Sequence, residues 1–315
     1  MSLVDLPPWL WRVFGPLFGL LWGSFINVVV HRHPRGMSVV HPPSHCPGCN
    51  QPVRPYDNIP VFSWLLLRGR ARCCGVAISP RYPLVEAAGG LLAWAVVETQ
   101  VLTLSPDTPA ARALAIYVAY LAFALGLLAA SFIDLEHFYV PDEISLGGTL
   151  VGFATATLRD SSWVESGVGA LAGFLVVWLP FDVLYRRLRG RTGMAMGDAK
   201  LVMMAGAWFG WTGALFALVA GAAQGLVGAG LLWLLSGKVG DPQALERERA
   251  AALAEIEALP EAERAEARAE LDDDPLFQPG GGGLGSRLAF GPFLALAMLE
   301  RLFFGPPSFL RLLEP

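Results

Sequence analysis

Two aspartates of this chain stand where apolar segments meet basic loops. Asp134 lies in Ile-Asp-Leu-Glu-His-Phe-Tyr-Val-Pro-Asp at 133–142, and Asp198 lies in Met-Gly-Asp-Ala-Lys at 196–200. An ionised carboxylate beside a hydrocarbon segment is unfavourable unless it is paired or hydrated. Two carboxylates in such positions therefore predict a catalytic pair.

A pair of carboxyl groups held a few ångström apart can hydrolyse an amide bond without a metal or a covalent intermediate. The two groups cannot both ionise cheaply, so they share a proton near neutral pH. The ionised member can activate water, while the protonated member polarises the peptide carbonyl. The plainer alternative is that each aspartate caps a helix end or pairs with a neighbouring cation such as Lys200 or Arg191.

All four cysteines of the chain fall in one polar segment, as Cys46-Pro47-Gly48-Cys49 and Cys73-Cys74. A Cys-x-x-Cys turn lets two thiolates converge on one Zn²⁺. A domain as small as this segment needs a cross-link of that kind to be stable. Cys46, Cys49, Cys73 and Cys74 are therefore the candidate zinc ligands. Adjacent cysteines rarely bind one ion together, so reduced structural thiols are the alternative.

The composition places these residues in a membrane protein. Hydrophobic residues make up 54% of the 315 residues and charged residues 16%, with a mean hydropathy of +0.48. A soluble domain needs more polar surface than this. We expect an all-α polytopic membrane protein with about eight transmembrane helices and a small cytoplasmic Cys-containing loop domain. The expected spans are 13–30, 84–104, 112–133, 141–158, 165–185, 197–209, 212–235 and 287–304.

The distribution of positive charge predicts the orientation of the spans. Eighteen of the 23 Lys and Arg residues fall in loops on one side, which the positive-inside rule assigns to the cytoplasm. Both aspartates and all four cysteines then face the cytoplasm, where reducing conditions favour metal binding over a disulfide. Both chain ends lie on the other side. The first span has no basic leader or cleavage site and is expected to remain uncleaved.

The short segment 197–209 suggests how Asp198 reaches water. At about 1.5 Å per residue it makes a helix of roughly 20 Å, against a hydrocarbon core of about 30 Å. We expect Asp198 to lie below the lipid headgroups in a water-accessible notch, or the bilayer to be thinner there.

Five regions are expected along the chain. They are a first transmembrane helix (1–31), a cytoplasmic Cys-rich loop domain (32–83), a membrane peptidase core (84–236), a cytoplasmic acidic helical insertion (237–286), and a last transmembrane helix with a tail (287–315). Residues 241–274 carry twelve acidic and four basic side chains, and Pro260 divides two helical halves, 244–259 and 261–271. A solvated helical hairpin is the simple interpretation, and a partner-docking element is the alternative.

Further motifs occur in order along the chain. They are Gly-Ser-Phe-Ile-Asn-Val-Val at 23–29, Pro-Ser-His-Cys-Pro-Gly-Cys at 43–49, Asn-Ile-Pro-Val-Phe-Ser-Trp-Leu at 58–65, Leu-Arg-Gly-Arg at 67–70, Ile-Ser-Pro-Arg-Tyr-Pro-Leu-Val-Glu at 78–86 and Phe-Gly-Pro-Phe-Leu at 290–294. With the aspartate motifs, they make the chain resemble the bacterial type IV prepilin peptidases, which are bifunctional leader peptidases and N-methyltransferases of the aspartic Gly-x-Gly-Asp class. The resemblance covers essentially everything except 241–286.

The resemblance implies a multi-pass enzyme of the bacterial inner membrane with its active site facing the cytoplasm. Its substrates would be type IV prepilins or pseudopilins of a pilus or a type II secretion system, cleaved just before a phenylalanine that begins their apolar helix. Asp134 and Asp198 match the catalytic pair. The partners expected are these substrates and the lipid bilayer, with no nucleic acid.

The family also methylates the new amino terminus with S-adenosylmethionine, an activity associated with the cysteine-containing loop. No glycine-rich nucleotide fingerprint occurs there, so the cofactor-binding residues stay unassigned. Gly23, Asn27, Arg81 and Glu86 match family positions, but packing or ion pairing at helix ends would explain them equally well.

The chain departs from the family pattern at two places. Ala195 replaces the first glycine of Gly-x-Gly-Asp, which is tolerable if the backbone angles there are ordinary. In the second cysteine pair, Ala71 takes the first position, Cys74 the second, and Cys73 is an extra neighbour. Zinc binding and methylation depend on this second departure more than cleavage does.

Three other classes of protein predict different sequence features. A presenilin-like protease would carry a Pro-Ala-Leu motif near its last spans, and this chain has none there. A transporter would place polar residues in the middle of several spans, whereas these carboxylates lie at span ends. A non-catalytic assembly scaffold is compatible with the sequence.

Overall fold

The computed structural model describes the chain except residues 1, 190–193, 237–241, 274–287 and 307–315. Nearly all of the described residues outside the 33–80 segment are helical. The β pairings of the described chain are three isolated bridges, two of them inside that segment. The predicted all-α class is therefore confirmed. The helices are α1 (Pro8–Arg32), α2 (Phe62–Leu66), α3 (Arg81–Val96), α4 (Ala110–His137), α5 (Asp142–Ala154), α6 (Trp163–Val177), α7 (Tyr185–Arg189), α8 (Met196–Ser236), α9 (Pro242–Ala258), α10 (Glu261–Asp273) and α11 (Gly291–Phe304).

Short turns extend or join these helices. A π turn, η4 (Val97–Val101), continues α3, and another, η6 (Trp178–Leu184), joins α6 to α7. The 3-10 turns are η1 (Leu3–Asp5), η2 (His33–Arg35), η3 (Pro55–Asp57) and η5 (Ala156–Arg159).

Five of the described helical segments are long and apolar enough to cross a membrane. They are Pro8–Arg35, Arg81–Val101, Ala110–His137, Trp163–Leu188 and Met196–Leu235. α5 and α11 have 13 and 14 residues, so each is roughly 20 Å long and falls short of a bilayer core of about 30 Å. A polytopic membrane protein is thus confirmed, whereas the predicted count of eight spans is not.

A break at Gly210 divides α8 into two halves. Gly210 has φ 68° and ψ −176°, which is outside helical geometry and suits a residue without a Cβ. A Cβ added to Gly173 of α6 would meet Val202 from the first half and Ala214 from the second. Both halves therefore pack on one face of α6, and the chain reverses at Gly210. The predicted boundary between 197–209 and 212–235 falls at this break.

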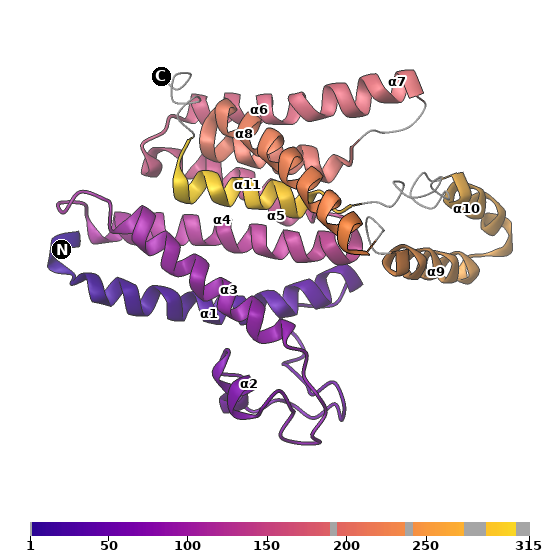
Figure 1. Cartoon of the computed structure of the whole chain (residues 1–315), viewed down its shortest axis with the longest axis horizontal. Helices are drawn as coiled ribbons and strands as arrows, with labels where there is room; N and C mark the ends of the chain where they lie inside the picture. The colour runs from indigo at the N-terminus through magenta and orange to yellow at the C-terminus, as the bar shows by residue number, and fades with distance from the viewer. Residues whose placement is uncertain (1, 190–193, 237–241, 274–287, 307–315) are drawn as a thin grey trace.

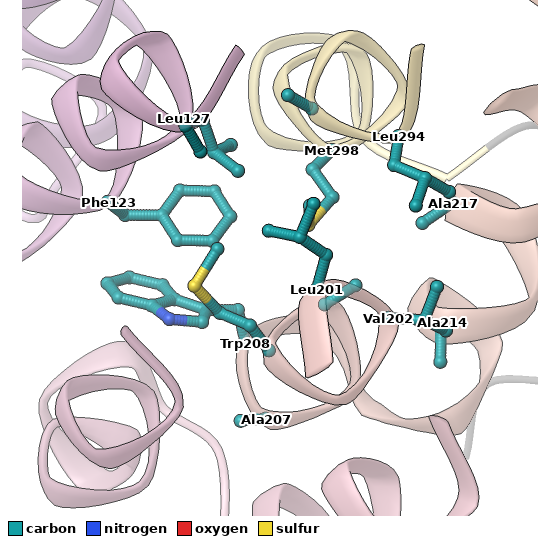
Figure 2. Packing of buried hydrophobic residues seen from close by; sticks show 14 of the residues in the cluster. Phe123, Leu127, Leu201, Val202, Ala207, Trp208, Ala214, Ala217, Leu294 and Met298 are labelled. Atoms are coloured by element: carbon teal, nitrogen blue, oxygen red, sulfur yellow. The ribbon is translucent and has the colours of Figure 1, made fainter. Parts of the chain in front are cut away.

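α4 lies at the centre of the helical bundle. Figure 1 shows α1 and α3 on one side of α4, and α11, α8 and α6 on the other. One apolar cluster joins α4 to α8 and α11, and Figure 2 shows Phe123 of α4 against Trp208 of α8, with ring centroids 4.3 Å apart. A second cluster joins α4 to α1 and α3, where Val30, Val85 and Ile133 are almost fully buried.

Two appendages leave the bundle at separate places. The segment that contains α2 lies beside α1 and α3, while α9 and α10 project past the His137 end of α4 (Figure 1). α9 and α10 correspond to the two predicted halves of the acidic hairpin, and an ion pair between Arg249 and Asp272 at 3.0 Å links them. α9 also approaches α4. The structure thus contains the predicted helix pair, and the independence of this region stays a prediction.

Close backbone packing between α6 and α8 leads to a stability prediction. A Cβ on Gly206 would lie 2.0 Å from the carbonyl oxygen of Gly169, so Gly206→Val should lower the free energy of unfolding by about 1–3 kcal/mol or more. Thermal unfolding in detergent measures this. Gly230→Val is the matched control in the same helix, because a Cβ there meets no atom within 4 Å. Equal unfolding temperatures for the two variants would contradict the packing described.

Candidate active site and cysteine cluster

Asp134 lies one turn before the end of α4. The helix ends because Phe138 takes the left-handed conformation, with φ 54°, and its N–H donates to the carbonyl oxygen of Asp134 at 2.9 Å. The Asp134 residue is only 6% exposed. The chain enters α5 at Asp142, four residues after Phe138.

Asp198 lies in the first turn of α8 and is 8% exposed. A carboxylate is favoured there by the partial positive charge of a helix amino terminus. A Cβ added to Gly197 would approach Val140 at 3.3 Å, so the start of α8 packs closely against the connection after α4. This contact brings the start of α8 to the end of α4.

The fold brings the two aspartates together from segments far apart in sequence. The packing of Gly197 against Val140 holds the two helix ends that bear them side by side. A third helix reaches the same place, because the N–H of Gly291, the first residue of α11, donates to Oδ2 of Asp134 at 2.9 Å. The site therefore lies where the end of α4 meets the starts of α8 and α11.

The neighbouring cations pair with other carboxylates. Lys200 Nζ lies 2.6 Å from Oδ1 of Asp142, and Arg81 pairs with Glu136. Within the described part of the chain, no ion pair involves either aspartate. Arg191 lies outside the described residues. Ion pairing to Lys200 therefore does not explain Asp198.

The four cysteines form a compact cluster outside the helical bundle. Their sulfur atoms all lie within 4.8 Å of one another. Cys46 and Cys74 have sulfurs 3.5 Å apart, and Cys49 and Cys73 have sulfurs 3.2 Å apart. Four thiolates around one Zn²⁺, with Zn–S bonds of about 2.3 Å, would have sulfurs roughly 3.7 Å apart. The cluster fits such an ion with small adjustments.

The first cysteine pair sits on a tight turn. The N–H of Cys46 donates to the carbonyl oxygen of Gln51 at 2.8 Å, and the N–H of Asn50 donates back to that of Cys46 at 2.9 Å. Asn50 has φ 56°, which closes the turn. Donation from the N–H groups of Cys49 and Gly48 lowers the pKa of the Cys46 thiol to about 6. Cys46 is therefore the thiol most ready to become a thiolate ligand.

The second turn repeats this backbone pattern with an alanine in place of the first cysteine. The N–H of Ala71 donates to the carbonyl oxygen of Val76 at 2.9 Å, and the N–H of Gly75 donates to that of Ala71 at 2.8 Å. Ala71 thus occupies the position of Cys46, and Cys74 the position of Cys49. The thiol of Cys73 turns into the cluster instead. Hydrogen bonds with the thiols of Cys49 and Cys46 raise the pKa of Cys73 to about 12.

A cavity of about 920 Å³ lies between the cysteine segment and the ends of α1 and α3. Its wall includes Cys46, Asn27 and Glu86. Glu86 is 8% exposed and accepts the N–H of Val61 at 2.7 Å, while Asn27 donates to the carbonyl oxygen of Tyr82 at 3.1 Å. The sequence did not reveal this cavity, because its walls come from segments that no single motif joins.

The other matched positions have structural explanations or new roles. A Cβ on Gly23 would lie 2.9 Å from Cα of Glu86, so this glycine permits close packing of α1 on α3. Arg81 pairs with Glu136 at the ends of α3 and α4 and lies over the ring of Phe132. Gly291 was part of a recognised motif, but only the fold reveals its contact with Asp134.

Comparison with known proteins finds two matching families. Residues 17–99 match the bacterial peptidase A24 N-terminal domain, and residues 121–231 match the type IV leader peptidase family. No solved structure matches the chain.

Several relatives carry the name prepilin leader peptidase/N-methyltransferase. The protein from Aeromonas hydrophila is 36% identical over 256 residues, which cover 72% of this chain and 83% of the relative. The protein from Klebsiella pneumoniae is 38% identical over 214 residues, covering 65% and 87%. The protein from Myxococcus xanthus is 37% identical over 235 residues, covering 72% and 67%.

Proposed function

Because the chain belongs to the type IV leader peptidase family, we propose that it removes the leader from prepilins with Asp134 and Asp198 as the catalytic pair. The observation that carries this assignment is that two buried carboxyl groups lie at helix ends that pack against each other, with no cation partner in the described chain. Such a pair is costly in a membrane protein and useful to a hydrolase. Prepilin cleavage is accompanied by N-methylation, as in the named relatives.

The geometry suits hydrolysis by a shared proton. The ionised carboxylate takes a proton from water as the water attacks the scissile carbonyl carbon. The protonated carboxyl group donates to the carbonyl oxygen, and a proton then passes to the leaving nitrogen when the C–N bond breaks. Both groups are nearly enclosed, so their electrostatic effect on the reacting peptide is stronger than it would be in water.

The position of the pair suits a substrate that is itself a membrane helix. The first half of α8 ends at the Gly210 break, so it is roughly 20 Å long and holds Asp198 short of a full bilayer thickness. A prepilin whose apolar helix lies in the bilayer would present the bond before that helix near this depth. The pair would face the cytoplasmic side of the inner membrane, in agreement with the distribution of Lys and Arg.

The cavity beside the cysteine segment is the proposed site for S-adenosylmethionine, which supplies a methyl group to the new terminal amine. Its volume of about 920 Å³ is ample for a ligand of this size, since such pockets range over about 300–1,000 Å³. The buried carboxylate of Glu86 and the amide of Asn27 would hold polar groups of the ligand. Glu86 also fixes the backbone at Val61, so it shapes the cavity wall.

The cysteine cluster is the proposed zinc site, with Cys46, Cys49, Cys73 and Cys74 as ligands. Zinc would bind the two turns to each other and thereby order a segment that has little apolar core of its own. Cys46 and Cys73 also line the cavity, so the order of the turns should affect methylation more than cleavage.

Our first prediction concerns the catalytic pair. Asp134→Asn and Asp198→Asn should each reduce leader cleavage by at least about 1,000-fold, because the mechanism needs both carboxyl groups. The double variant should lose little more than either single variant. Mass spectrometry of a co-expressed prepilin reports the cleaved fraction. Asp142→Asn is the matched control, because Asp142 forms an ion pair with Lys200 and is not part of the catalytic pair. This variant should cleave at near the parent rate. Substantial cleavage by a well-expressed Asp134 or Asp198 variant would refute the assignment.

The second prediction concerns zinc. Purified protein should contain about one zinc ion per chain, and Cys73→Ala should lower this content. Adding Ala71→Cys to Cys73→Ala should restore it, because Ala71 occupies the position in the second turn that Cys46 holds in the first. Elemental analysis measures the metal, and limited proteolysis measures the order of 32–83. A metal content that does not depend on Cys73 would exclude it as a ligand.

The third prediction separates the two activities. Glu86→Gln should weaken S-adenosylmethionine binding and reduce N-methylation by about tenfold, while leader cleavage stays near the parent rate. Calorimetry on the detergent-solubilised protein and mass spectrometry of the processed pilin give the two readouts. Glu98→Gln is the control, because Glu98 follows α3 and pairs with Arg12 away from the cavity. Unchanged binding in the Glu86 variant would place the methyl donor elsewhere.

A further inference from the structure

The start of α11 is packed directly against the carboxyl group of Asp134. The N–H of Gly291 donates to Oδ2 at 2.9 Å in a buried contact between residues 157 positions apart. A Cβ added to Gly291 would lie 2.7 Å from that oxygen and 3.1 Å from Cγ. The helix start can approach the carboxyl group this closely only because residue 291 has no side chain.

Gly291 provides the N–H group of this helix turn that is available to Asp134. Pro292 has no N–H. The N–H groups of Phe293 and Leu294 donate to the carbonyl oxygen of Phe290, at 3.0 and 3.2 Å. Helix starts normally leave several N–H groups for outside acceptors, but here Pro292 has none and Phe293 uses its own within the turn. The contact with Asp134 is therefore a single, defined hydrogen bond.

Contacts farther along α11 fix the helix along its axis. The side chain of Gln100 donates to the carbonyl oxygen of Leu302 at 3.0 Å, and Gln224 donates to Glu300 at 2.7 Å. Leu294 and Met298 are completely buried in the cluster with α4 and α8. A helix held in this way cannot slide along α4 without losing these contacts. The Gly291 N–H is thus kept at a set distance from Asp134.

We propose that Gly291 is a positioning residue of the peptidase, which acts by holding Oδ2 of Asp134 through its backbone N–H. With Oδ2 engaged, Oδ1 is the oxygen left to carry the proton shared with Asp198 and to act on water. The partial positive charge at the start of α11 reinforces the contact. This inference rests on the proposed function, because it requires Asp134 to be a catalytic residue.

A role in packing alone makes a different prediction. If Gly291 only leaves room for the Asp134 side chain, then removal of its N–H without any added atom should be harmless. If the N–H positions the carboxyl group, the same change should slow the chemical step. Substrate binding should be affected little in this case, because the N–H of Gly291 is already engaged by the carboxyl group of Asp134.

The decisive variant replaces Gly291 by glycolic acid, which converts the N–H into an ester oxygen and adds no side chain. Cell-free synthesis into lipid nanodiscs allows this replacement. We expect kcat for leader cleavage to fall by about 10- to 100-fold, as for a misplaced catalytic group, with KM within about twofold of the parent. The same replacement at Gly230 is the control, because it removes a hydrogen bond within α8 at a position where an added Cβ would meet no atom within 4 Å. It should leave both constants near the parent values.

A second variant, Gly291→Ala, keeps the N–H but displaces the carboxyl group, and it should also lower kcat. Gly126→Ala, in the same helix as Asp134, is its control. A Cβ added at Gly126 meets only Ile144, at 3.5 Å. Methylation of a precleaved pilin peptide reports that each variant is folded. Parent-level kcat in the glycolic acid variant would overturn the proposal, as would an equal loss of cleavage and methylation there. Asp134→Asn is measured alongside, and cleavage by that variant would instead refute the proposed function.

Discussion

The architecture depends on α4 being packed along both of its faces. Val30 and Val85 belong to the cluster that includes Ile133, while Leu294 and Met298 belong to the cluster that includes Leu127. A carboxyl group can be kept at a fixed place near hydrocarbon only if the helix that bears it cannot rotate or slide. Rotation of α4 by one residue would move Asp134 by about 100° around the axis and away from α8. The two clusters prevent this.

Close approach of backbones occurs in two helix pairs of the described chain. Gly19 and Gly89 allow contact between α1 and α3, and Gly169 and Gly206 allow contact between α6 and α8. In lipid the hydrophobic effect does not favour one apolar contact over another, so association depends on close packing and hydrogen bonds. Small residues such as glycine allow the close packing. At Gly291 the absence of a side chain likewise lets a backbone N–H reach the carboxyl group of Asp134.

The cysteine segment is stabilised in a different way because it lies outside the bundle. It contains the single helical turn α2 and a few 3-10 residues, and its two tight turns meet at the thiols. The repeated hydrogen-bond pattern explains how Ala71 is accommodated. The second turn keeps its backbone hydrogen bonds without a cysteine at position 71, and Cys73, two residues after Ala71, supplies the sulfur atom instead. The cavity between this segment and α3 then has one wall from the membrane helices and one from the turns, so its shape depends on both.

The sequence by itself determined the helical class, the membrane setting and the break near Gly210. It also singled out the two aspartates and four cysteines as candidate site residues. These follow from apolar runs, turn residues and charges, which act locally. The predicted count of eight spans is not confirmed, because α11, with 14 residues, packs on neighbouring helices and is shorter than a bilayer core. Only the tertiary structure decided the contact of Gly291 with Asp134, the pairing of Lys200 with Asp142, and the cavity beside Glu86. Each joins segments distant along the chain, and such contacts are set by how helices pack, which no local pattern of residues encodes.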